Sequence, residues 1–76
     1  MIQKIREAMR RAGFQDAPND PRARLADFGF DSLMVVLTVS ELEREFAMKI
    51  PAASLEERTF ESLTEIEAFL KKLGAR

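Results

Sequence analysis

Apolar residues recur along the chain at the spacing of amphipathic helices, and no stretch alternates apolar and polar residues as a strand would. The first such segment begins near the N-terminus. It stops at Gly13, a residue type that often follows a helix end, and Arg10 and Arg11 suit the helix dipole in its last turn. Its apolar stripe consists of Ile2, Ile5, Met9 and Ala12. The pattern predicts a first helix that ends at Gly13.

A second helix is predicted from Ser32 to about Ala47, ahead of Pro51, because the residue before a proline avoids helical angles. At about 100° per residue, five apolar side chains gather on one side, where we expect the core: Val35, Val36, Val39, Leu42 and Phe46. The opposite side carries Met34, Leu37, Ser40, Glu41 and Arg44. Two apolar residues on that outward side, close to Ser32, favour a partner-docking patch over chance exposure.

The last third of the chain contains two further helix starts. Ser54 and Glu57 match a capping box, which predicts a short third helix. Thr59 is expected to cap a fourth helix that ends at Gly74. The apolar stripe of this helix consists of Leu63, Ile66, Leu70 and Leu73, widened by Phe60 and Phe69.

Residues 14–31 form a long connection between the first two helices. Asp20 and Pro21 are expected to start a short helical turn there, since proline is tolerated at a first helical position. Three apolar side chains should anchor the connection to the bundle: Leu25, Phe28 and Phe30. Gly29 is expected to supply a backbone conformation that a Cβ would hinder. The fold class is therefore all-α: a small bundle of three main helices and one short helix, in a single domain over residues 1–76.

Size and composition exclude several classes of chemistry. With 76 residues, no cysteine and no histidine, the chain has neither disulfides nor thiol or imidazole catalysis, and we expect no metal site. Residues 1–24 carry a net charge of +3 and residues 25–76 a net charge of −4. The acidic part speaks against nucleic acid as a partner. No apolar run is long enough to span a bilayer, and the lack of cysteine suits the cytoplasm.

Ser32 is the one side chain that offers a chemical handle. A hydroxyl at a helix start lies beside unpaired backbone amides and the positive end of the dipole, a setting that favours an added phosphate-type anion. Asp31 and Ser32 are also ordinary helix caps, so the dipeptide alone proves little. Three carboxylate pairs spaced by four residues are interpreted as surface groups, not as acid–base machinery: Glu41/Glu45, Glu57/Glu61 and Glu61/Glu65.

The stretch DFGFDSL at residues 27–33 does not stand alone, because a helix that closes on Phe46 and then Ile50-Pro51 follow it. In this combination the chain resembles an acyl carrier protein over roughly residues 25–70. The resemblance implies an acyl-carrier-like four-helix bundle in which Ser32 carries 4′-phosphopantetheine from coenzyme A. It further implies a monomeric, non-catalytic carrier of acyl thioesters. The implied partners are a phosphopantetheinyl transferase and enzymes that activate and transfer acyl groups.

The resemblance also includes a departure. Acyl carriers of general fatty-acid synthesis usually place acids at the positions of Met34 and Leu37, so a specialised fatty-acid or polyketide-type pathway is favoured here. The expected docking residues are Leu33, Met34, Leu37, Glu41 and Arg44. An aminoacyl or peptidyl carrier is an alternative, and a small helical adaptor without a prosthetic group is another. Sheltering of cargo would require the core around Val36, Val39, Leu42, Phe46 and Leu63 to open.

Overall fold

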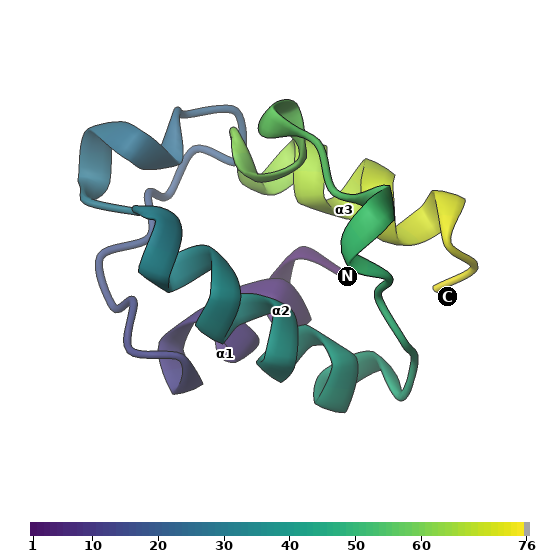
Figure 1. Ribbon diagram of the computed structural model, residues 1–76. Helices are drawn as coiled ribbons and strands as arrows, with labels where there is room; N and C mark the ends of the chain where they lie inside the picture. The colour runs from purple at the N-terminus through teal and green to yellow at the C-terminus, as the bar shows by residue number, and fades with distance from the viewer. Residues whose placement is uncertain (76) are drawn as a thin grey trace.

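Three α-helices and three single 3₁₀ turns make up the protein in a computed structural model that describes residues 1–75. The helices are α1 (Ile2–Arg11), α2 (Ser32–Phe46) and α3 (Leu63–Lys72), and these residues include no strand. The turns are η1 (Leu25–Phe28), η2 (Ala52–Ser54) and η3 (Glu57–Phe60). The long connection passes around one end of the bundle, while both termini lie toward the other (Figure 1). The all-helical expectation is confirmed.

The stripes predicted for the first and last helices face the core. Ile5, Ala8 and Met9 of α1 are fully buried, as are the three stripe residues of α3 that lie within the helix. Arg10 and Arg11 lie in the last turn of α1, and Gly13 adopts a φ of 107° just after it. Burial of each large apolar side chain contributes about 1.5–3 kcal/mol to the free energy of folding, so these stripes supply much of the stability of so small a domain.

On α2 the buried side matches the predicted one only in part: Val35, Val39 and Phe46 pack against the core as expected, but one predicted core residue does not. Thr38 and Leu42 are fully buried, whereas Val36, expected in the core, is 66% exposed. Val36 lies about 120° around the helix from Leu42, so it belongs to the flank that turns toward solvent. Met34, expected to face outward, is half-buried and packs against the core. Its flexible side chain reaches the end of α1, where its Cε lies 3.9 Å from the position that a Cβ on Gly13 would occupy.

The connection between α1 and α2 is tied to the beginning of α3. The backbone amide of Leu25 donates to the carbonyl of Glu61 at 2.9 Å, and that of Thr64 donates to the carbonyl of Pro21 at 3.0 Å. Leu25 is buried as expected, but Phe28, the last residue of η1, is 43% exposed and does not anchor the connection as predicted. Asp20 caps only a tight turn, and the short helix begins later, at Leu25.

Two predicted helix caps were wrong. Ser54 lies inside η2, and its hydroxyl donates to the carbonyl of Pro51. The capping box belongs instead to η3, where the hydroxyl of Thr59 accepts a hydrogen bond from the amide of Glu56 at 3.0 Å. Thr59 is therefore occupied, and Ser62 caps α3 by accepting from the amide of Glu65 at 3.2 Å. The short third helix is thus two 3₁₀ turns.

Candidate functional site

Ser32 is the first residue of α2 and is exposed to solvent. Asp31 precedes it as the N-cap, with an extended backbone, and its carboxylate accepts a hydrogen bond from the amide of Met34 at 3.0 Å. The carbonyl of Asp31 accepts from the amide of Val35 at 3.0 Å and closes the first helical turn. Asp31 therefore holds the first turn of α2 in place, and the backbone of Ser32, which carries the hydroxyl, is held with it.

The electrostatic setting of Ser32 suits an anion. The first four amides of a helix lack acceptors within the helix, and Asp31 satisfies two of them through its side chain and its carbonyl. Among residues 1–75, no acceptor is recorded for the amides of Ser32 and Leu33, which leaves them at the positive end of the helix dipole. A phosphate attached to this hydroxyl would lie beside these amides, and they offset the repulsion from Asp31.

Gly29 and Phe30 hold the chain that leads into α2. Gly29 has a φ of 91°, which an L-residue with a side chain seldom adopts, and its amide donates to the carbonyl of Ala26. The turn directs Phe30 into the core, where its ring packs edge-on to Phe14 at 5.1 Å and stacks with Phe60 at 6.0 Å between ring centroids. This aromatic cluster holds Phe30, which directly precedes Asp31. The packing of the core therefore determines where Ser32 lies.

A groove of about 480 Å³ opens beside Ser32. Apolar side chains contribute to its wall from three elements: Phe30 before α2, Val35 on α2 and Phe60 in η3. The rest of its lining is polar or small: Arg24, Ala26, Asp31, Ser32, Glu57 and Glu61. An exposed hydroxyl at a helix N-terminus, next to a groove of mixed polarity, fits a phosphate-linked arm with amide and methylene groups.

The outward side of α2 carries three apolar residues, which we call the outer patch: Leu33, Val36 and Leu37. They are 65%, 66% and 41% exposed. Leu33 and Leu37 lie where the sequence predicted docking residues, whereas Val36 replaces Met34 in this group. The helical wheel placed Val36 in the core and Met34 outside, and the structure has them the other way round. Which side of α2 is covered depends on how α1 packs against it, and a wheel of α2 alone does not contain this information.

The predicted docking residues Glu41 and Arg44 differ in exposure. Glu41 is half-buried and accepts a hydrogen bond from Arg11 of α1 at 2.9 Å, while Arg44 is exposed at the edge of the helix. Glu45 accepts from the same guanidinium at 2.8 Å. Hydrogen bonds to Glu41 and then Glu45 raise the pKa of Arg11 above its usual value. These two glutamates therefore serve as partners of α1, a pairing that sequence spacing did not reveal.

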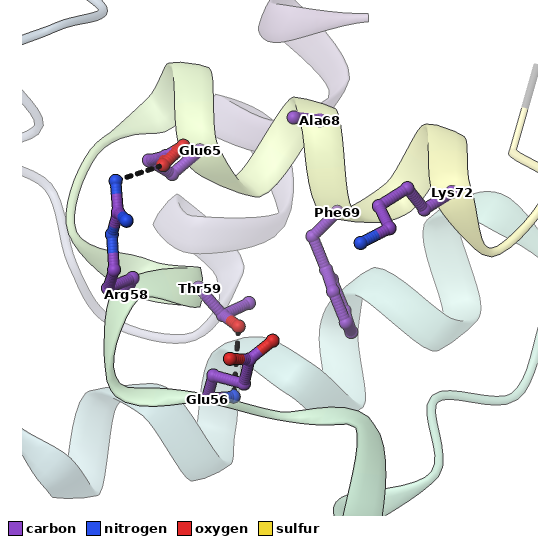
Figure 2. A pocket seen from close by; sticks show the side chains of 7 residues that line it. All are labelled: Glu56, Arg58, Thr59, Glu65, Ala68, Phe69 and Lys72. Carbon is purple, nitrogen blue, oxygen red and sulfur yellow. Dashed lines mark hydrogen bonds and ion pairs between the residues drawn. The ribbon is translucent and has the colours of Figure 1, made fainter.

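A second cavity, of about 320 Å³, lies between η3 and α3 and has no residue in common with the groove beside Ser32. Figure 2 shows Arg58 reaching toward Glu65, and Phe69 and Lys72 lining the opposite wall. Its lining residues are Glu56, Arg58, Thr59, Glu65, Ala68, Phe69 and Lys72. Charges of both signs on flexible, exposed side chains give it no defined ligand chemistry.

Neither a metal centre nor a membrane-spanning helix is found in the part of the chain that the structure describes. Within residues 1–75 no three acidic, cysteine or histidine side chains come together, and none of the helices is long and apolar enough to cross a bilayer. Of the carboxylate pairs interpreted as surface groups, Glu57 and Glu61 are exposed, whereas Glu41, Glu45 and Glu65 are half-buried.

Comparison with known proteins identifies the family of the chain. No curated protein and no solved structure matches the chain. The family model described as the phosphopantetheine attachment site matches residues 3–67. Members of this family carry 4′-phosphopantetheine covalently, are not enzymes themselves, and work with phosphopantetheinyl transferases and acyl-handling enzymes. With a helical bundle, an exposed serine at a helix start and a family match over most of its length, the chain belongs to the phosphopantetheine-carrying acyl carrier family.

Proposed function

We propose that Ser32 is the residue that bears the arm and that the chain carries acyl intermediates as thioesters in a dedicated fatty-acid-like or polyketide-like pathway. One observation supports the choice of residue above all: Ser32 is an exposed hydroxyl in the first turn of a helix, beside two amides without acceptors. The other hydroxyls of α2 lack this setting, since Thr38 is buried and Ser40 lies two turns further along.

Loading of the carrier is a phosphoryl transfer from coenzyme A. The Ser32 Oγ forms a bond to the phosphorus that carries pantetheine, the pyrophosphate bond of coenzyme A breaks, and adenosine 3′,5′-bisphosphate leaves. The serine proton passes to a base of the transferase, because the carrier offers no imidazole or thiolate for this purpose. The carrier itself presents the hydroxyl, stabilises the attached phosphodiester through the helix N-terminus and exposes a docking surface next to it. Once attached, the arm supplies a thiol on which a carboxylic group is held as a reactive thioester.

A dedicated pathway is favoured over general fatty-acid synthesis by the side chains around Ser32. Leu33, Val36 and Leu37 give the adjacent surface an apolar character, which differs from the acidic surface expected of a general fatty-acid carrier. We further propose that residues 1–76 act as a single monomeric domain in the cytoplasm, where the lack of cysteine suits a reducing medium.

Mass spectrometry of the intact protein tests the attachment residue. The chain is incubated with coenzyme A, magnesium and a phosphopantetheinyl transferase, and we expect a gain of one phosphopantetheine group. Ser32→Ala should gain none. Ser40→Ala, which removes an exposed hydroxyl from the same helix, should be loaded like the unmodified chain. Loading of Ser32→Ala, or a requirement for Ser40, would refute the assignment.

A further inference from the structure

The acidic side chains of α2 are already engaged within the protein. Arg11 of α1 donates to Glu41 through Nε at 2.9 Å and to Glu45 through Nη2 at 2.8 Å. The carboxylate of Glu43 accepts a hydrogen bond from the backbone amide of Ile50 at 2.7 Å. All three glutamates are half-buried. The acids that would give α2 a negative docking surface are thus turned toward other parts of the same chain.

The surface left for a partner is apolar, with a cation at its far end. The outer patch is exposed over the first two turns, and Arg44 follows on the same side of the helix. At about 100° per residue, the outer patch and Arg44 fall within an arc of about 100°. Arg44 lies about 18 Å along the helix axis from Ser32, at 1.5 Å per residue. Its nearest carboxylate oxygen, on Glu41, is 3.6 Å away and belongs to the group that Arg11 already binds.

From this charge pattern we propose that enzymes acting on Ser32 bind the outer patch with an apolar depression and bind Arg44 with an acidic side chain, instead of meeting α2 with a basic surface. This inference rests on the proposed attachment at Ser32 and names the chemistry of the partner at that site. A basic surface that follows α2 would face Arg44 and find Glu41 and Glu45 neutralised by Arg11, so it would gain little attraction from this helix. The carboxylates that remain exposed near Ser32 border the groove instead of lying on the outer side of α2. An apolar surface would bury three large side chains close to the serine.

Two phosphopantetheinyl transferases provide the probes, one whose carrier-binding surface is basic and one whose surface is apolar. The measurement is kcat/KM for transfer from coenzyme A. We expect the apolar enzyme to be favoured by about tenfold or more, which corresponds to about 1.4 kcal/mol of docking free energy. Its kcat/KM should fall only about twofold to threefold between about 50 and about 300 mM NaCl, because the apolar contacts are not screened by salt and only the single ion pair at Arg44 is.

Variants measure separately how much the outer patch contributes to docking and how much Arg11 weakens the attraction of Glu41 and Glu45 for a basic surface. Val36→Ser combined with Leu37→Ser should lower kcat/KM of the apolar enzyme about tenfold, mainly through KM. Arg11→Gln frees Glu41 and Glu45, so it should raise kcat/KM of the basic enzyme several-fold at low salt and not at high salt. Ala68→Glu, a change at an exposed position of α3, is the control and should leave both enzymes unaffected. Circular dichroism confirms that each variant is folded.

The outcomes distinguish this inference from the proposed function. Absence of any loading at Ser32 by either enzyme would overturn the proposed function itself. Loading of Ser32 that favours the basic enzyme and falls steeply with salt in the unmodified chain would overturn only the docking inference. A dimer in analytical ultracentrifugation that the double serine variant converts to a monomer would also overturn it, because a second copy would then be the occupant of the outer patch.

Discussion

Replacement of Thr38 by valine should stabilise the protein. Thr38 is fully buried in α2, and its Oγ1 has no hydrogen-bond partner among the described residues. Burial of a hydroxyl without a partner costs about 1–3 kcal/mol by protein mutational data. Valine has nearly the same shape and a similar helix propensity, so Thr38→Val removes this cost without a cavity. We expect an increase of about 1 kcal/mol in the free energy of unfolding, or about 4–8 °C in Tm.

Two further substitutions make this test specific. Thr38→Ser keeps the hydroxyl and loses the methyl group, so it should destabilise the protein by about 1 kcal/mol. Thr64→Val is the matched control, because the hydroxyl of Thr64 donates to the carbonyl of Pro21 at 3.1 Å. Loss of that hydrogen bond should cost about 0.5–1.5 kcal/mol. The same chemical change is therefore expected to act in opposite directions at the two positions.

Urea unfolding followed by far-ultraviolet circular dichroism is the suitable assay, because the chain has no tryptophan or tyrosine. The slope of the unfolding transition should be the same for all variants, since the surface exposed on unfolding hardly changes. A Thr38→Val protein less stable than the unmodified chain would refute the reasoning. It would mean that the hydroxyl is satisfied, for example by the carbonyl one turn earlier in the helix.

Substitutions at four other positions test the loop that leads to the serine and the packing of α2. Asp31→Ala should cost about 1 kcal/mol by loss of the helix cap, while Asp31→Asn keeps an acceptor and should cost a few tenths; equal losses in chemical denaturation would contradict the capping role. Gly29→Ala should cost about 1–2 kcal/mol in the same measurement through the positive φ alone, since no atom lies within 4 Å of the added Cβ. Leu42→Ala should cost about 2–5 kcal/mol, whereas Val36→Ala should cost under about 0.5 kcal/mol; similar losses at both positions would contradict the observed rotation of α2.

Much of the fold could be predicted from the sequence because its signals are local. The stripes of α1 and α3 repeat without interruption, and Gly13 and Gly74 mark their ends. The start of α2 at Ser32 was predicted from the cap and from the family resemblance together. These features depend on residues a few positions apart, and helix periodicity describes such relations well.

The rotation of α2 could not be predicted in the same way. A wheel assigns valine to the core and threonine to the flank by polarity, so it placed Val36 inside and overlooked Thr38. The packing of α1 against α2 decides which arc is covered, and this information lies in another part of the chain. The pairing of Arg11 with Glu41 and Glu45 joins residues 30 and 34 positions apart, which no periodicity reports.

The caps in the last third were misplaced for a different reason. Ser54, Thr59 and Ser62 are all suitable helix caps within nine residues. The sequence offers several possible starts there, and the structure uses two of them in 3₁₀ turns or their caps before α3 begins. Which hydroxyl becomes the cap of the main helix depends on where Phe60 and Leu63 reach the core.

The hydrogen bonds from Leu25 to Glu61 and from Thr64 to Pro21, at the beginning of α3, have a consequence for the timing of modification. One of these hydrogen bonds joins residues 43 positions apart, and closure of so long a loop costs more entropy than any contact within a helix. A nascent chain that has not yet produced residues 61–64 already contains Asp31, Ser32 and Leu33, yet it lacks the partners that hold the preceding loop. We therefore expect attachment at the proposed residue, Ser32, to follow synthesis of α3, so that a chain that has not yet reached α3 is not loaded with the arm.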